Sequence, residues 1–170
     1  METKSNRSWM EKIRVKLGFV GKLVVECEGK SGGLCLMWTD RVDISLISYS
    51  RFHIDVRVSS YGDSDWRFTG FCGHPEADQR RHAWSILKRL HDMAQLPWHC
   101  LADTDEILSV DEKLGDLARS RMLMESSREA LDYCGLDDLG FRGPMFSWCN
   151  KRDGNELVQE RLDRGVCNLD

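Results

Sequence analysis

The most regular pattern in the chain is an alternation of apolar and polar residues between positions 42 and 58. The alternation is interrupted only by a tight connection at Tyr49–Arg51 and then continues to its end. A period of two is typical of strands that bury one face. The pattern predicts an antiparallel hairpin with one wet face, on which His53, Asp55 and Arg57 meet solvent.

Other apolar runs predict further short strands and three helices. The spacing of Met10, Ile13 and Leu17 predicts a helix that ends at Gly18. The predicted strands cover 19–27, 34–38, 66–72, 98–102, 145–149 and 162–167, with a glycine-rich turn at 28–33. The two longer helices are predicted at 75–95, opened by a proline, and at 117–133, closed by a glycine.

Many short strands, mostly with antiparallel connections, and two substantial helices favour two sheets packed face to face with helices outside. The sequence contains no internal repeat and no linker-like stretch. We therefore expect one α+β domain over residues 1–170, built as a four-layered α/β sandwich.

Composition narrows the function classes. The chain has 170 residues, 41% of them hydrophobic, and a formal charge of -4, which argues against a generally basic nucleic-acid surface but not against a local basic patch. Seven cysteines without a CxxC pair favour reduced, mostly buried thiols over a zinc site. No apolar run approaches a membrane span and no signal peptide is visible, so we expect an intracellular protein of the nucleus or cytoplasm.

Three acids follow the predicted strand at 98–102, namely Asp103, Asp105 and Glu106. Open sheets place ligands and chemistry at the carboxyl ends of core strands. A divalent cation, a nearby base or plain solvent exposure would each accommodate this charge. A calcium loop is disfavoured, because Leu108 stands where that loop needs glycine.

Taken together, the motifs of the chain resemble those of the endonuclease/exonuclease/phosphatase superfamily, most closely the endonuclease domain of plant LINE-type (non-LTR) retroelements. The resemblance covers nearly all of the chain. It rests on ordered motifs: Glu2-Thr3-Lys4, Lys30-Ser31-Gly32-Gly33-Leu34, Trp66-Arg67-Phe68-Thr69-Gly70-Phe71, Gly73-His74-Pro75, Asp103 with Asp105-Glu106-Ile107, Phe146-Ser147-Trp148, and Glu160-Arg161-Leu162-Asp163-Arg164.

The resemblance implies Mg²⁺-dependent cleavage of phosphodiester bonds, with Mn²⁺ as the alternative ion. Glu2 and Asp103 would hold the metal, and Asp103 would also orient or deprotonate the attacking water. Asp105 would face the scissile phosphate, and Asp163 would support a catalytic histidine. It also implies contacts to nucleic acid, DNA rather than RNA, from Lys30, Ser31 and His74.

Departures from the family pattern point to a degenerate domain. Asp105 stands where the family has asparagine, and a carboxylate repels a phosphate to which an amide would donate. Cys72 replaces a tyrosine, and no histidine follows His99. We expect a domain truncated at both ends, weak or inactive, of retroelement origin. The alternative is an active Mg²⁺-dependent endonuclease.

Several of these residues also have a simpler interpretation, without a role in catalysis or binding. Glu2 is alternatively a solvated terminal residue, and Asp105 a solvent-facing turn acid. Glu106 reads as the start of a helical turn, and His74 as a structural loop residue. The basic residues of the helix at 75–95 are most simply a solvated face: Arg80, Arg81, Lys88 and Arg89.

Overall fold

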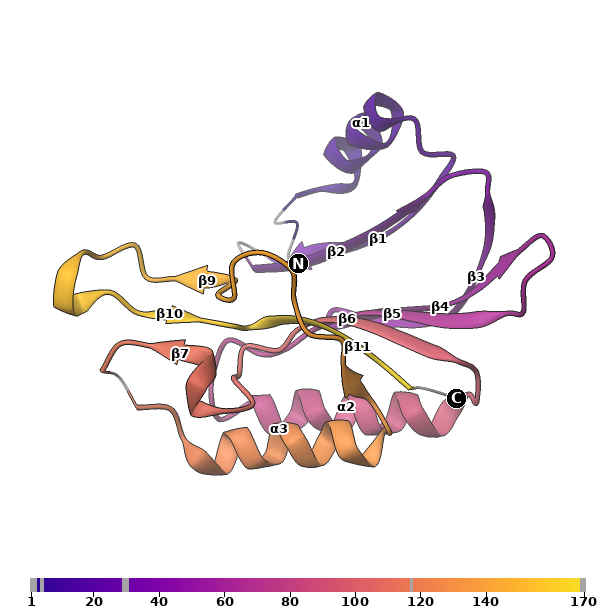
Figure 1. Cartoon of the computed structure of the whole chain (residues 1–170). Helices are drawn as coiled ribbons and strands as arrows, with labels where there is room; N and C mark the ends of the chain where they lie inside the picture. Colours follow the sequence, from indigo (N-terminus) through magenta and orange to yellow (C-terminus); the bar gives the residue numbers. More distant parts are fainter. Residues whose placement is uncertain (1–2, 4, 29–30, 117, 169–170) are drawn as a thin grey trace.

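The computed structural model of the chain describes residues 3, 5–28, 31–116 and 118–168. Its main elements are three helices and three groups of strands (Figure 1). In chain order they are α1 (Arg7–Leu17), β1 (Gly21–Glu28), β2 (Ser31–Trp38), β3 (Val42–Ser50), β4 (His53–Ser60), β5 (Trp66–Cys72), α2 (Arg80–Met93), β6 (Trp98–Asp103), β7 (Lys113–Leu114), α3 (Arg121–Tyr133), β8 (Asp137–Asp138), β9 (Trp148–Cys149), β10 (Gln159–Glu160) and β11 (Asp163–Cys167).

The largest sheet has six strands in the order β3-β4-β5-β6-β11-β8. All its pairs are antiparallel except β5 with β6, which α2 connects as a crossover helix. β1 and β2 form a separate antiparallel hairpin, and β7-β10-β9 form a small third sheet. Among the described residues, no helix is both long enough and apolar enough to cross a bilayer.

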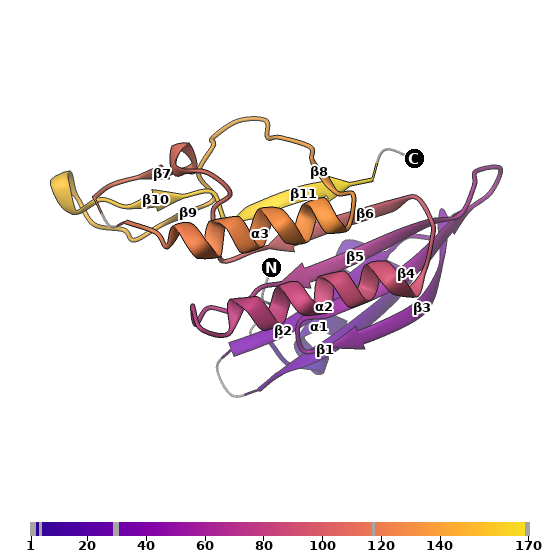
Figure 2. The same cartoon turned by 90° about the horizontal axis from the view of Figure 1, so that it is seen from below.

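Two cores lie on opposite faces of the large sheet. On one face α2 and α3 bury a cluster that includes Leu87, Trp98 and Cys100. On the other face the β1–β2 hairpin packs its Leu34 against Val56 and other residues of β3 to β5. α1 lies outside that hairpin, so helix, hairpin, sheet and helices form the four predicted layers (Figures 1 and 2).

The predicted wet face of the first hairpin is wrong for β4. Its His53 and Asp55 are buried, and only Arg57 is exposed. Asp55 is fully buried because the guanidinium of Arg67 on β5 binds both its oxygens, at 2.8 and 2.7 Å. Asp55 fits the alternation of apolar and polar residues, but it does not face water, because a polar side chain with such a partner can be buried.

Several element boundaries also differ from the predictions: the helix expected at 117–133 begins at Arg121, and the strand expected at 145–149 covers only Trp148–Cys149. Residues 31–33, expected in a turn, belong to β2, where Gly33 has a φ of 84° and Thr3 lies beside it. The helix expected from Pro75 begins only at Arg80, because 75–79 form bends and turns.

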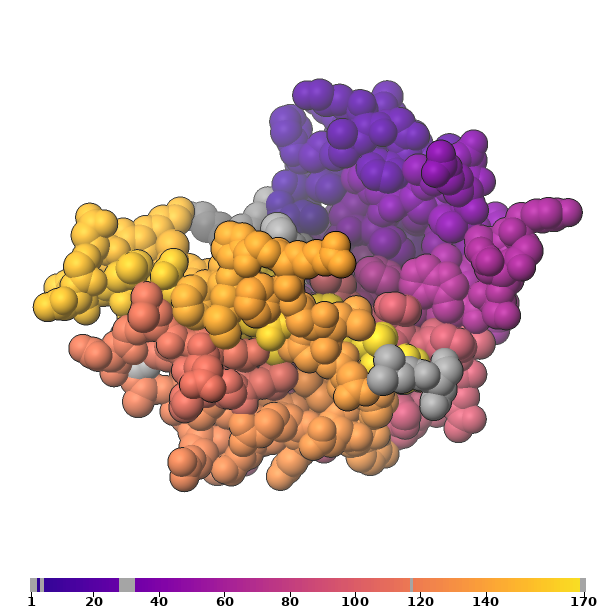
Figure 3. Space-filling model, in the orientation of Figure 1, coloured from indigo at the N-terminus to yellow at the C-terminus, as the bar shows by residue number. Residues whose placement is uncertain are grey.

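The β1–β2 hairpin covers only the half of the sheet formed by β3, β4 and β5. Figure 3 shows this N-terminal layer, in indigo, standing above one side of the molecule. As a result Leu101, in the middle of the interior strand β6, is 57% exposed on that face.

We predict that the same substitution costs much more stability on one face of the sheet than on the other. Leu87→Ala opens a cavity in the helix-covered core and lowers the free energy of unfolding by about 2–5 kcal/mol. Leu101→Ala, at the exposed position, lowers it by less than about 1 kcal/mol. Urea unfolding followed by circular dichroism measures both; equal losses would contradict the exposure of Leu101.

Candidate functional site

A cleft of about 250 Å³ opens where β6 ends and β11 begins. All three aspartates predicted from the sequence line it. The full lining is Arg80, Asp103, Asp105, Arg119, Ser147, Trp148, Glu160, Leu162 and Asp163. The structure thus brings together residues that lie up to eighty-three positions apart in the chain, from Arg80 to Asp163.

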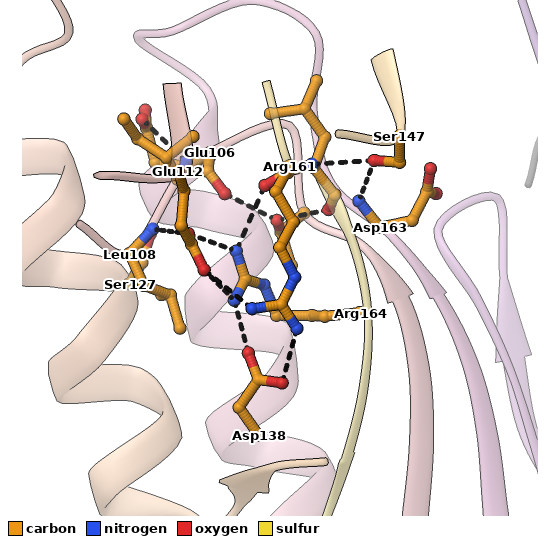
Figure 4. Close-up of polar contacts among 12 residues, drawn as sticks. Glu106, Leu108, Glu112, Ser127, Asp138, Ser147, Arg161, Asp163 and Arg164 are labelled. Carbon is orange, nitrogen blue, oxygen red and sulfur yellow. Dashed lines mark hydrogen bonds and ion pairs between the residues drawn. The ribbon is translucent and has the colours of Figure 1, made fainter. Parts of the chain in front are cut away.

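Strand pairing places two of these carboxylates side by side. Asp103, the last residue of β6, pairs with Asp163, the first of β11, and on its other side with Cys72. The hydroxyl of Ser147 accepts the backbone N–H of Leu162 at 3.0 Å and that of Asp163 at 2.9 Å (Figure 4). Ser147 thereby fixes the start of β11 at the cleft.

A close backbone approach holds the neighbouring loop against β6. The N–H of Gly73 donates to the carbonyl of Asp103 at 2.6 Å. A Cβ at Gly73 would lie 2.6 Å from the carbonyl oxygen of Thr104, so only glycine fits here. Asp105, just beyond, has a φ of 52°, a left-handed conformation that aspartate and asparagine tolerate better than most residues.

Glu106 is fully buried and is not the start of a helical turn. Its carboxylate lies 2.8 Å from Nη1 of Arg80 and 3.8 Å from Nη1 of Arg119. Arg80 is therefore not on a solvated helix face, as the sequence suggested. In the structure Arg80 is the first residue of α2, where an arginine opposes the helix dipole and needs a specific anionic partner.

Arg119 and Glu160 form the second ion pair of the cleft. Neither was predicted as a site residue, although Glu160 belongs to a motif of the resemblance. Nε of Arg119 donates to Glu160 at 2.9 Å, its Nη2 binds the other oxygen, and Lys113 adds a bond of 2.6 Å. Burial raises the pKa of Glu160, but the hydrogen bonds from Arg119 and Lys113 outweigh this and hold it at about 2. Arg119 also donates to the carbonyl of Asp105 at 3.1 Å.

A second buried network supports β11 from behind (Figure 4). Arg161 and Arg164 each bind both Glu112 and Asp138, at 2.7–2.9 Å for the shortest contact of each pair. Burial raises the pKa of Glu112, yet hydrogen bonds from Arg164 and from the N–H of Leu108 leave it below its ordinary value. The network ties the segment before β7 to β8 and β11.

The oxygen donors of the cleft fit a hard cation with few protein ligands. Mg²⁺ commonly binds one or two carboxylates and keeps several waters. The paired Asp103 and Asp163 offer such donors at the mouth of one cleft. Within the part of the chain that the structure describes, no three His, Cys, Asp or Glu residues come together as a metal-binding group.

Several predicted site residues stay predictions. Glu2 and Lys30 lie outside the described residues, as does the side chain of Ser31. His74 lies in the loop after β5, half-buried, with its carbonyl accepting from Nε of Arg80 at 3.2 Å. Its contact with nucleic acid is therefore not tested by this arrangement.

No protein-family model matches the sequence, and neither does any curated protein. Solved structures do resemble it. The endonuclease domain of TRAS1, a telomere-specific non-LTR retrotransposon, has a TM-score of 0.63 at 12% identity, covering 88% of this chain and 67% of that one. The 3′ phosphatase NExo from Neisseria, bound to a product DNA hairpin, has a TM-score of 0.69 at 13% identity, covering 99% and 74%.

A third structure, an endonuclease/exonuclease/phosphatase family protein from Bacteroides thetaiotaomicron, has a TM-score of 0.62 at 9% identity and covers 96% of this chain and 66% of its own. The chain therefore has the fold of the endonuclease/exonuclease/phosphatase superfamily. The resemblance drawn from the motifs is confirmed at the level of the fold.

We predict that Glu160 makes stability depend on acid pH. Its pKa is about 2 in the folded chain against an ordinary 4.5, so its contribution is complete above about pH 4.5 and is lost as the pH falls toward 2. Glu160→Gln should cost about 3–5 kcal/mol at neutral pH, because Arg119 and Lys113 lose their buried partner. The difference from the wild type should shrink as the pH falls through this window.

Urea unfolding at a series of pH values provides the measurement. Glu156→Gln is the matched control, because its pair with Arg152 is mostly exposed and should contribute little at any pH. A Glu160→Gln difference that stays constant from pH 7 to pH 2 would contradict the prediction.

Proposed function

We propose that this chain is a nucleic-acid phosphodiesterase domain of retroelement origin, of the LINE type, that uses Mg²⁺ or Mn²⁺ and turns over slowly. The observation that carries the proposal is the cleft in which Asp103, Asp105 and Asp163 meet, in a fold shared with nucleases and phosphatases. DNA is the proposed substrate. Two structural neighbours, a retrotransposon endonuclease domain and a phosphatase bound to a DNA hairpin, support this choice.

The cleft suggests a role for each carboxylate. Asp103, anchored on both sides by strand pairing, is the proposed base that orients and deprotonates a water. Glu2 and Asp103 are the proposed metal ligands. Asp163, which pairs with Asp103, is the proposed support for a catalytic histidine. A bound Mg²⁺ would polarise the phosphoryl oxygen and neutralise the charge that grows on it.

Slow turnover follows from the side chain at position 105. Asp105 lines the cleft, and the hydrogen bond from Arg119 to its carbonyl holds its backbone there. A carboxylate can accept hydrogen bonds but donates none unless it is protonated. At a position that faces a phosphate it repels the substrate, where an amide would bind it.

The competing proposal is an active endonuclease with ordinary turnover, in which Asp105 serves as an additional metal ligand. The oxygen-only donor set of the cleft favours this alternative as much as it favours slow turnover. The two proposals differ in what an amide at position 105 would do.

We predict that purified protein nicks supercoiled plasmid slowly in the presence of Mg²⁺ and that Asp103→Ala lowers the rate by about 10²- to 10⁴-fold. The exposed Asp111, outside the cleft, supplies the matched control Asp111→Asn, which should nick like the wild type. Gel electrophoresis of relaxed and supercoiled forms measures the rate. Nicking that survives EDTA, or that Asp103→Ala retains in full, would refute the assignment; no nicking by any form would exclude an enzyme.

We predict that Asp105→Asn raises the nicking rate at least about tenfold, because the amide donates to a phosphate oxygen and removes a negative charge. Asparagine adopts left-handed backbone readily, so the loop should keep its conformation. The same plasmid assay decides the point. If the rate falls instead, Asp105 acts as a metal ligand and the competing proposal holds.

A further inference from the structure

A cluster of planar side chains lies outside the cleft and has no part in the chemistry proposed above. The guanidinium carbon of Arg51 stands 4.5 Å above the ring centre of Phe52. The ring centres of His74 and His82 lie 5.6 and 6.5 Å from that of Phe52, at interplanar angles of 51° and 74°. Three separate segments, the β3–β4 turn, the loop after β5 and the first turns of α2, contribute these residues.

The cluster is attached directly to the edge of the cleft. The carbonyl of Phe52 accepts the N–H of Cys72 at 2.8 Å, and the next residue, Gly73, donates to Asp103. Arg80, which lines the cleft, donates from Nε to the carbonyl of His74 at 3.2 Å. Figure 2 shows the first turns of α2 and α3 and the small sheet β7-β10-β9 at one end of the molecule.

The four side chains are accessible rather than part of a core. Arg51 and His82 are exposed, Phe52 and His74 are half-buried, and none of them belongs to the three buried hydrophobic clusters of the described residues. Nδ1 of His74 accepts the N–H of Glu76 at 3.2 Å, so in the neutral ring the proton resides on Nε2. The imidazole therefore offers a donor beside an aromatic face.

We propose that Arg51, Phe52, His74 and His82 form a subsite that binds an unpaired nucleotide of the strand whose phosphate lies in the Asp103 cleft. This inference rests on the proposed function. Bases stack on aromatic rings and on guanidinium planes only when they are released from a duplex. The imidazole donor of His74 suits the flanking phosphate, so the cluster offers contacts to both the base and the phosphate of a nucleotide.

A purely electrostatic contact is the other role that this surface could have. In that case the cluster would bind any backbone phosphate, whether the strand carries bases or not. The presence of Phe52 at the centre, in contact with all three other members, favours stacking, because an apolar ring contributes nothing to a phosphate contact. The experiment separates the two by removing the base.

Binding of a short, fluorescein-labelled single-stranded DNA is measured by fluorescence anisotropy in EDTA, so that no turnover is needed. Phe52→Leu removes the ring but keeps an apolar side chain. Tyr61→Leu is the matched control, since Tyr61 is fully exposed in the turn after β4, away from this cluster. Phe52→Leu should weaken binding by about five- to a hundredfold, the usual range for one stacked base, and Tyr61→Leu by less than about twofold.

Two competitor strands complete the test. An abasic strand of the same length, and a blunt duplex, should bind the wild type and Phe52→Leu equally, because neither offers a base to stack. Thermal melting confirms that each variant is folded; if Phe52→Leu is not, the exposed His82→Ala replaces it and should show the same selectivity for single strands. Equal losses on the abasic strand, an unchanged affinity for single strands, or no binding of single strands by the wild type would each overturn the subsite.

These outcomes are independent of plasmid nicking. A chain that fails to nick but loses single-strand affinity through Phe52→Leu keeps the subsite and loses the proposed enzyme activity. A chain that nicks in an Asp103-dependent manner, with Phe52→Leu binding like the wild type, keeps the activity and loses the subsite.

Discussion

The carboxylate of Glu106 is buried completely, and a charge in that position persists only if counter-charges reach it. Arg80 from the start of α2 and Arg119 from the segment before α3 supply them. Arg119 extends the chain of contacts to Glu160 and to the backbone of Asp105. The start of α2, the segment before α3, β10 and the loop after β6 are thus fixed relative to one carboxylate. Such pairs add little net stability, but they admit few alternative arrangements, and the shape of the cleft depends on that restriction.

The fold was predictable for segments that bury one face and expose the other to water. α1 follows from its apolar spacing and from Gly18, and β6 from the alternation that begins at Trp98. The prediction failed for β4, because alternation reports polarity and not exposure. Asp55 fits the polar half of the pattern but is buried by its pair with Arg67. The late start of α2 has another cause: Arg80 donates to the carbonyls of His74 and Pro75, and His74 packs beside the ring of Phe52, and apolar spacing reports neither of these contacts.

The candidate site was predictable only in its acidic half. Asp103 and Asp163 carry a local signal, because each adjoins a short apolar strand. Arg119 carries no such signal, and its ion pair with Glu160 of β10 joins positions forty-one residues apart. Glu160 and Ser147 belong to motifs of the resemblance, but those motifs contain neither the partner of Glu160 nor the two backbone N–H groups that the hydroxyl of Ser147 accepts at β11. Ion pairs and caps of this kind depend on the fold being formed first.

The arginines of the cleft do not make it a ready-made phosphate site. The guanidinium of Arg80 donates hydrogen bonds to Glu106 and to two loop carbonyls. The guanidinium of Arg119 donates to Glu160 and to the carbonyl of Asp105. If either arginine turned toward a phosphate, it would leave a buried carboxylate unpaired, and breaking such a buried pair costs about 3–5 kcal/mol. The positive charge that a phosphodiester needs must therefore come from a cation or from outside the cleft. This constraint comes from the chain's own contacts, which hold both arginines of the cleft on buried carboxylates.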